Sequence, residues 1–310
     1  MHPKSLLSAA IAATLCLARA WAGVPSIPPL EEKAAPLELI DPAALGFGFA
    51  GFIIDTTVQG RLDYDGREGG GVDLSEVRAI APVGKVDLGN WLVAATVNYS
   101  WTQADFGGLR GLGTANLHTI EANIVLAYRR ADSPWWLLSF ISPGISTDFN
   151  NVSGEAFNAS ALGLLGYRWN PRLDLALGVF ADYSLNDVTV MGSIGVIWRP
   201  NDRWIVQATP PIVAIGYRPN SDWTISAVTY PGGGKWEVGG REQDVREVDL
   251  SLWRAALSIE RKFGPHWRVS ARGGVAFGGE LELRDSQSRV LVNRDLEPAP
   301  FGAVAVRWAF

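Results

Sequence analysis

Apolar and polar residues alternate along most of the chain from Leu45 onward. Segments 91–101, 173–183, 188–198 and 267–277 place an apolar residue at almost every second position, with small or polar residues between. Successive side chains of a β-strand point to opposite faces, so this period of two predicts strands with one apolar and one polar face. The chain is therefore expected to be all-β.

The length of these segments indicates which medium contacts the apolar face. Each runs for about ten residues, the length of a tilted membrane strand, whereas strands of soluble proteins average about 5–6. Aromatic residues close the segments, as Trp91 and Trp101 do, or Trp267 and Phe277. Such aromatic belts mark the two interfaces of a membrane. The pattern favours a transmembrane antiparallel up-and-down β-barrel. A soluble secreted β-sandwich that binds a ligand remains the alternative.

The connections differ in length on the two sides. Tight Pro/Asn/Asp turns flanked by aromatics and Arg occur at 128–135, 167–172, 198–204, 217–223 and 261–267. Longer links rich in Gly, Asn and Ser fall at 57–73, 106–115, 147–158, 231–244 and 285–297. Short turns on one side and long loops on the other are typical of an outer-membrane barrel.

The strand count depends on residues 204–217. Read as one strand, this segment gives an odd total of thirteen, whereas single-chain bacterial barrels have even strand numbers. Proline cannot donate a ladder hydrogen bond, so a break at Pro210 and Pro211 has a physical cause. We therefore expect about 12–14 strands and prefer fourteen.

The N-terminus predicts the compartment. Residues 1–22 carry Lys4, an apolar stretch and Ala20-Trp21-Ala22, the layout of a secretory signal peptide cleaved after Ala22. Residues 23–44 hold five prolines and predict an extended periplasmic tail, and 45–310 form the barrel. The expected location is the outer membrane of a Gram-negative bacterium, in contact with its lipids and lipopolysaccharide.

The last strand carries a candidate assembly signal. Its apolar face ends with Trp308 and Phe310, and a terminal aromatic with another two residues earlier resembles the signal of bacterial outer-membrane barrels. We expect the barrel assembly machinery to bind it.

Features from about Leu74 to Phe310 resemble an uncharacterised family of bacterial outer-membrane β-barrels, described as a domain of unknown function. They are Pro143-Gly144-Ile145 before Ser146-Thr147-Asp148, the Tyr-Arg and Trp-Arg-Pro-Asn turns, and Leu177-Gly178-Val179. The resemblance implies the barrel architecture and no activity.

Charged residues on the polar strand faces are expected to point into the barrel. They are Glu121, Asp174, Asp182, Arg254, Glu260, Arg268 and Arg272. Charged side chains inside a barrel must be paired with each other or hydrated. These residues therefore form either a network that seals the lumen or charged rings along a solute path. We expect a channel or binding barrel for small polar solutes, in which charge reversal of Arg268 and Arg272 shifts ion preference without preventing assembly. A structural or adhesion barrel acting through its loops is the alternative.

Signals for other chemistry are weak. Residues 46–51 match a dinucleotide fingerprint literally, but they lie in a strand pattern without the helix that this motif needs. His118 is the candidate through which an enzyme would have to work, and no Ser partner is evident. Asp63, Asp65 and Glu68 form an incomplete acidic loop. We therefore expect no enzyme, cofactor or metal. The formal net charge of −5 argues against a nucleic-acid partner.

Overall fold

The computed structural model describes residues 51–66, 69–109, 112–150, 152–185, 187–209, 211–239 and 244–309. The expected signal peptide, the Pro-rich tail, Glu68 and Phe310 lie outside these described residues. Within them the strands are β1 (Gly51–Asp63), β2 (Gly71–Leu88), β3 (Trp91–Gly107), β4 (Thr114–Arg129), β5 (Trp135–Thr147), β6 (Phe157–Asn170), β7 (Leu173–Ser184), β8 (Asp187–Asn201), β9 (Trp204–Thr209), β10 (Ile212–Tyr217), β11 (Trp223–Glu237), β12 (Val245–Phe263), β13 (Trp267–Asp285), β14 (Val290–Leu296) and β15 (Ala299–Ala309). A short 3-10 helix, η1 (Gly154–Ala156), precedes β6.

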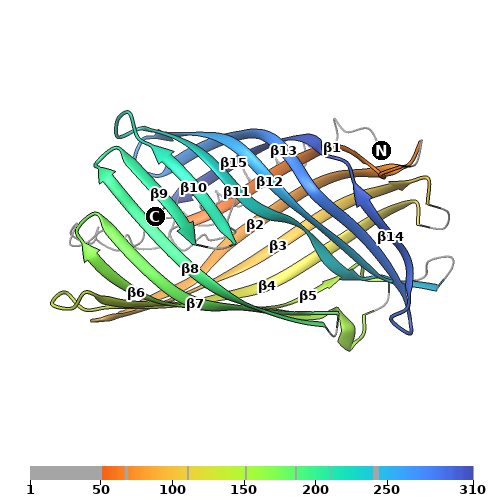
Figure 1. Cartoon of the computed structure of the whole chain (residues 1–310), viewed down its shortest axis with the longest axis horizontal. Coiled ribbons are helices and arrows are strands. Elements are labelled where there is room, and N and C mark those ends of the chain that lie inside the picture. The colour runs from red at the N-terminus through yellow and green to blue at the C-terminus, as the bar shows by residue number, and fades with distance from the viewer. Residues whose placement is uncertain are drawn as a thin grey trace, which may run out of the picture. The chain divides into compact units, whose positions relative to one another are not determined.

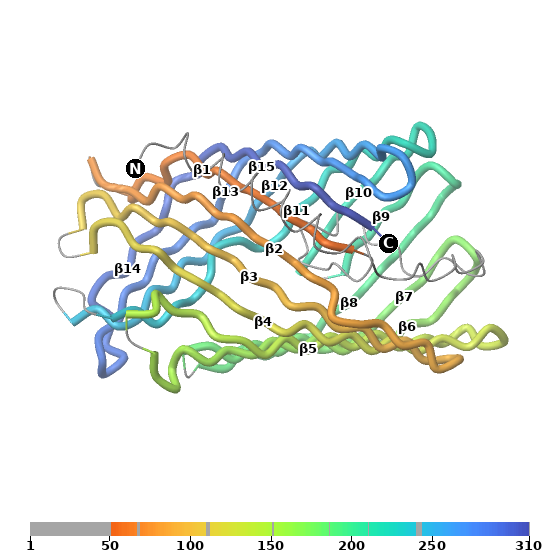
Figure 2. The backbone as a smooth tube through the Cα atoms, turned by 180° about the vertical axis from the view of Figure 1, so that it is seen from behind, coloured from red at the N-terminus to blue at the C-terminus, as the bar shows by residue number. Residues whose placement is uncertain are grey.

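The strands close into one antiparallel barrel (Figures 1 and 2). Sequence neighbours pair from β1 to β13, and β15 closes the sheet by pairing with β13 on one side and β1 on the other. The strand β14 pairs with residues 279–284 of β13, beyond the part that pairs with β15. Thus β14 and β15 together occupy one strand position of the barrel wall, which we call a stave, interrupted at Glu297 and Pro298. The barrel therefore has fourteen staves, which confirms the preferred count.

The interruption predicted at the two prolines is present. The strands β9 and β10 have six residues each and meet at Thr209, which pairs with Ile212. The other staves of the wall are roughly twice as long or longer, so the wall is shortest along the barrel axis at this hairpin.

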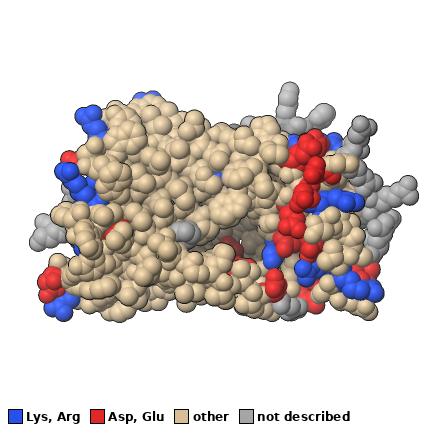
Figure 3. Space-filling view, viewed as in Figure 1, with Lys and Arg blue, Asp and Glu red and all other residues tan. Residues whose placement is uncertain are grey.

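The outer surface of the barrel is apolar between two aromatic rings. At the end where β1 starts and β15 finishes, which we call the turn end, aromatic rings pack in pairs such as Trp91 with Tyr128 and Trp204 with Tyr217. The second ring includes Tyr99, Tyr183 and their neighbours. Leu, Val and Ile side chains between the rings are exposed, and Figure 3 shows the resulting uncharged belt between two charged ends. This surface suits the hydrocarbon core of a membrane.

Three of the five predicted long loops are partly wrong, because strands continue into them, whereas 106–115 and 147–158 lie mostly outside the strands. Residues 57–63, 231–237 and 290–296 are strand, and β12 and β13 reach 19 residues each. The reason is that each extension contributes to one apolar core, through Leu62, Trp236, Leu296 and the partly buried Val292, so pairing continues beyond the membrane belt. We call this end of the barrel the extended end.

Candidate solute pathway

The seven charged residues singled out from the sequence all lie on inward-facing positions, but they do not form one ring. Arg254 and Arg272 are 2% and 6% exposed and lie in the middle of the barrel. Glu260, Arg268 and Asp174 lie nearer the turn end, and Glu121 faces inward from β4. The interior therefore holds several separate polar groups.

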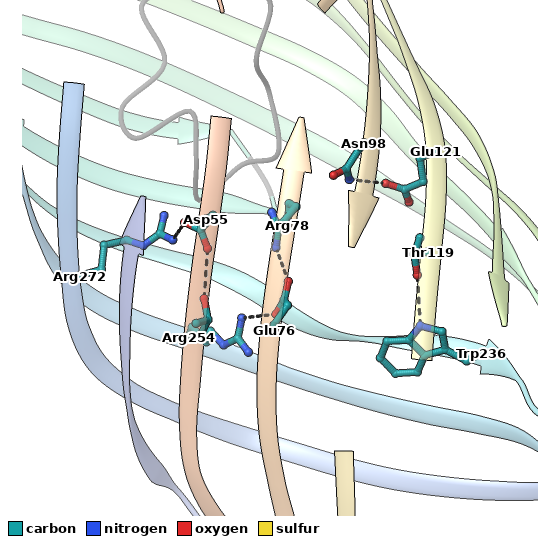
Figure 4. A network of polar contacts seen from close by, with 10 residues as sticks. Asp55, Glu76, Arg78, Asn98, Thr119, Glu121, Trp236, Arg254 and Arg272 are labelled. Atoms are coloured by element: carbon teal, nitrogen blue, oxygen red, sulfur yellow. Dashed lines mark hydrogen bonds and ion pairs between the residues drawn. The ribbon is translucent and has the colours of Figure 1, made fainter. Parts of the chain in front are cut away.

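The middle group consists of ion pairs that connect distant strands (Figure 4). The guanidinium of Arg272 on β13 bonds to Asp55 on β1. Arg254 on β12 donates to Glu76 on β2 at 3.2 Å, and Glu76 also accepts from Arg78 at 2.7 Å. Because β12 and β2 are not neighbours in the sheet, this contact crosses the interior.

Aromatic rings support the same two arginines. The guanidinium carbon of Arg254 lies 5.5 Å from the ring centroid of Phe301, and that of Arg272 lies 5.9 Å from the ring of Tyr230. Cation–π contacts of this kind stabilise a charge where water is scarce. The arginines are thus held on two sides and form a fixed part of the lumen wall.

Neutral polar side chains line the opposite wall. Asn98 donates to Glu121 at 2.9 Å, and Asn123 donates to Thr96 at 3.2 Å. Further along, Asn158 donates to the hydroxyl of Ser146 at 2.7 Å. This strip runs from β3 to β6 and gives the interior many donors and acceptors.

Two further charge groups lie toward the turn end. Asp174 accepts from Arg199 at 3.0 Å and from Arg168 at 3.4 Å. Glu260 lies 3.0 Å from Arg268 and 3.5 Å from Arg307. In both groups one carboxylate serves two arginines, so positive charge is in excess locally.

Some buried polar atoms inside the barrel have no protein partner among the described residues. They include Asn98 Oδ1, Ser193 Oγ and Gln59 Oε1. Buried polar atoms in folded proteins almost always have a hydrogen-bond partner, from the protein or from ordered water. Each of these atoms could bond a water molecule or a polar solute inside the barrel.

The extended end contains an apolar core. Its buried side chains include Leu62, Tyr64, Val72, Leu74, Phe106, Leu117, Trp236, Val248, Leu250, Leu281, Leu283 and Leu296. They come from β1–β4 on one wall and β11–β14 on the other, which face each other as two packed sheets do. This core fills the extended end above the polar lumen.

The end of β11 closes the remaining gap at this end. Glu237 pairs with Thr147 of β5, and its carbonyl accepts from the Asp148 amide at 3.1 Å. The indole of Trp236 donates to Thr119 of β4 at 3.1 Å, as Figure 4 shows. The strand β11 therefore crosses from its own wall to β4 and β5.

The two weaker sequence candidates lie outside the lumen. His118 faces outward, its Nδ1 is 2.9 Å from the Tyr99 hydroxyl, and its ring packs 4.9 Å from Phe149. It is thus part of the outer aromatic ring. Asp63 is paired with Arg61 at 3.1 Å, and no metal-binding cluster of three or more ligands is found in the described part of the chain.

Sequence reasoning missed Asp55 and Glu76, the partners of the buried arginines, and Arg78, which shares the Glu76 carboxylate. Asp55 lies between Ile53 and Thr57 on the same face of β1, and a charge at a regular inward position was the available signal. Residues 74–80 place apolar Leu74 and Ile80 on the same face as Glu76 and Arg78, so alternation alone assigns these two charges no side.

A comparison with known protein families identifies the family of the chain. A family model described as "Domain of unknown function (DUF6268)" matches residues 92–309, and the chain belongs to this family. No curated protein matches the chain in sequence.

Solved outer-membrane barrels resemble the structure distantly. An outer membrane channel from Pseudomonas putida F1 is 10% identical, with a TM-score of 0.43, covering 91% of this chain and 100% of that one. A Pseudomonas aeruginosa FadL homologue is 11% identical, with a TM-score of 0.42 and coverage of 87% and 94%. The KdgM porin in complex with oligogalacturonate is 10% identical, with a TM-score of 0.38 and coverage of 83% and 99%. This similarity says nothing about which solute the chain binds. The assignment as a barrel depends on the strand pairing of this chain.

Proposed function

We propose that the protein is an outer-membrane channel for small solutes. The observation that carries this proposal is the lumen itself, which is lined with charged and amide side chains. Among the described residues, the amide oxygens of Gln59 and Asn98 have no hydrogen-bond partner. A barrel that served only as a scaffold would gain more stability from an apolar filling, because buried ion pairs contribute little net stability.

The apolar belt and the two ends of the barrel support a location in the outer membrane. The uncharged belt fits a bilayer, and the short turns at the turn end fit the periplasmic side of an outer-membrane barrel. The extended end then projects outward. Its strands leave little free loop among the described residues, so the adhesion alternative has less support.

Reconstitution tests the proposal directly. The full-length chain, purified from outer membranes, is expected to give discrete conductance steps in a planar lipid bilayer and to admit small sugars in a liposome-swelling assay. A barrel that shows the heat-dependent gel shift of a folded protein but neither conductance nor swelling would overturn the channel function.

A further inference from the structure

One part of the barrel wall does not span the membrane belt. The hairpin of β9 and β10 starts at the aromatic pair Trp204 and Tyr217 of the turn end and stops after six residues per strand. A membrane-crossing strand needs about ten residues. The neighbouring β8 runs from Trp198 to Val188 over the same belt, so the hairpin ends near its middle.

Two strand edges are left facing each other above this hairpin. Within the described part of the chain, β8 pairs with β9 only from Val196 toward the turn end, and residues 187–195 pair with β7 alone. The strand β11 pairs with β10 only as far as Thr229, and residues 230–236 keep β12. Figure 1 shows the short β9–β10 hairpin between the longer β8 and β11, and Figure 3 shows a hollow in the same face of the molecule.

An open strand edge cannot face hydrocarbon, because each unsatisfied backbone group there costs several kcal/mol. Non-helical backbone is tolerated at membrane depth only where it is buried in protein or lines a wet cavity. The side chains agree with a wet opening. Met191 lies on the inward face of β8 and is 48% exposed. Ser193, two residues closer to the turn end, is 4% exposed, and its hydroxyl has no hydrogen-bond partner among the described residues.

Among the described residues, an apolar core occupies the barrel axis at the extended end. The apolar core fills the space between β1–β4 and β11–β14, and β11 crosses to β5 through Glu237. The ammonium of Lys235 on β11 also lies 3.9 Å from Asp187, which begins β8, so β11 borders the top of the opening as well as one side.

We propose that the gap bounded by β8, the β9–β10 hairpin and β11 is a lateral portal, through which small amphipathic solutes pass between the lumen and the outer leaflet. The proposal rests on the proposed channel function and adds its route and solute class. The outer rim of the portal is apolar, with Val190 and Ile194 exposed to the belt, whereas Ser193 and Gln207 line the inside. A solute that crosses both surfaces needs an apolar body and a polar group.

Cysteine accessibility tests the portal independently of transport. In a full-length chain with Cys16 replaced by Ser, Met191→Cys is expected to react with a charged, membrane-impermeant methanethiosulfonate in proteoliposomes. Leu177→Cys, an outward belt position that is 67% exposed in the structure, is the matched control. It should react about tenfold or more slowly, because the charged reagent must enter hydrocarbon to reach it. Equal, slow reaction at both positions would overturn the portal, provided each variant shows the heat-dependent gel shift.

Blocking the portal tests the route. Attaching a polyethylene glycol maleimide to Met191→Cys is expected to reduce uptake of the amphipathic dye 8-anilinonaphthalene-1-sulfonate by cells to the level without the protein. The same adduct on Val152→Cys, in the link between β5 and η1 at the extended end, should leave uptake unchanged. The reverse result would assign the route to the barrel axis. A reactive Met191→Cys in a barrel without conductance or dye uptake would instead contradict the channel function while retaining the opening.

Discussion

Arg254 on β12 bonds to Glu76 on β2 although β13, β15 and β1 lie between those two strands in the closed sheet. The two side chains are 3% and 13% exposed, so the pair lies deep in the barrel. Since Glu76 also binds Arg78, one carboxylate fixes arginines from two walls. The Arg254–Glu76 pair therefore links the β12 and β2 sides of the barrel next to the apolar core of the extended end.

Replacing Glu76 with Gln should therefore destabilise the barrel. The variant leaves the buried Arg254 without its carboxylate, and breaking a buried ion pair from one side costs about 3 kcal/mol. We expect the free energy of unfolding in detergent micelles to fall by this amount, measured by urea titration of Trp fluorescence. Asp202→Asn, in the exposed turn between β8 and β9, is the control and should change little. An equal effect of both variants would show that the cross-lumen pair has no special role.

Charge reversal at Arg268 should change ion selectivity. Arg268 lies on the lumen wall beside Glu260, and its side chain is 35% exposed. A charge in a narrow pore acts strongly on passing ions. The Arg268→Glu variant is thus expected to shift the reversal potential in a salt gradient toward cations. Arg130→Glu, in the turn between β4 and β5 and outside the lumen, should leave it unchanged. A shift with Arg130→Glu alone would place the selective charges outside the lumen.

The same substitution at Arg272 has a different expected outcome from the one the sequence suggested. The side chain of Arg272 is 2% exposed and is paired with Asp55, so Arg272→Glu would bring two buried carboxylates together. We expect this variant to lose assembled barrel, measured by the heat-dependent gel shift of outer-membrane fractions. Restored assembly in the double variant with Asp55→Arg would attribute the loss to the charge pair, and normal assembly of the single variant would contradict it.

Alternation predicted which face each residue occupies, because orientation in a strand depends only on local parity. It placed Arg254 and Arg272 inside and the belt residues outside. It did not predict their partners, because Glu76 and Asp55 meet these arginines only through barrel closure and the strand register. Nor did it predict the extended end. Residues 231–237 contain Pro231 and three glycines, which indicate a loop locally, yet they pair with β12 because their inward side packs against Leu250 and Leu252.

The apolar core of the extended end should contribute to stability in the manner of a soluble domain. Leu281 is fully buried between the two walls, so Leu281→Ala creates a cavity that costs about 2–5 kcal/mol. We expect earlier cleavage of the extended end by an added protease. Leu291→Ala, an exposed position on β14, is the matched control. Unchanged protease resistance of Leu281→Ala would contradict a tightly packed core.

The final strand closes the barrel, and its terminal aromatic is expected to guide assembly. Trp308 of β15 pairs with Trp267 of β13 and with Phe52 of β1, so this strand forms the seam between the first and last staves. Deleting Phe310 removes the expected recognition residue while leaving Trp308 and the seam pairing in place. The amount of barrel in outer-membrane fractions should then fall, with unfolded chain degraded in the periplasm. Phe310→Tyr, which keeps an aromatic end, should assemble normally. Equal outer-membrane levels of the deletion and the parent chain would show that assembly relies on other features of the last strand.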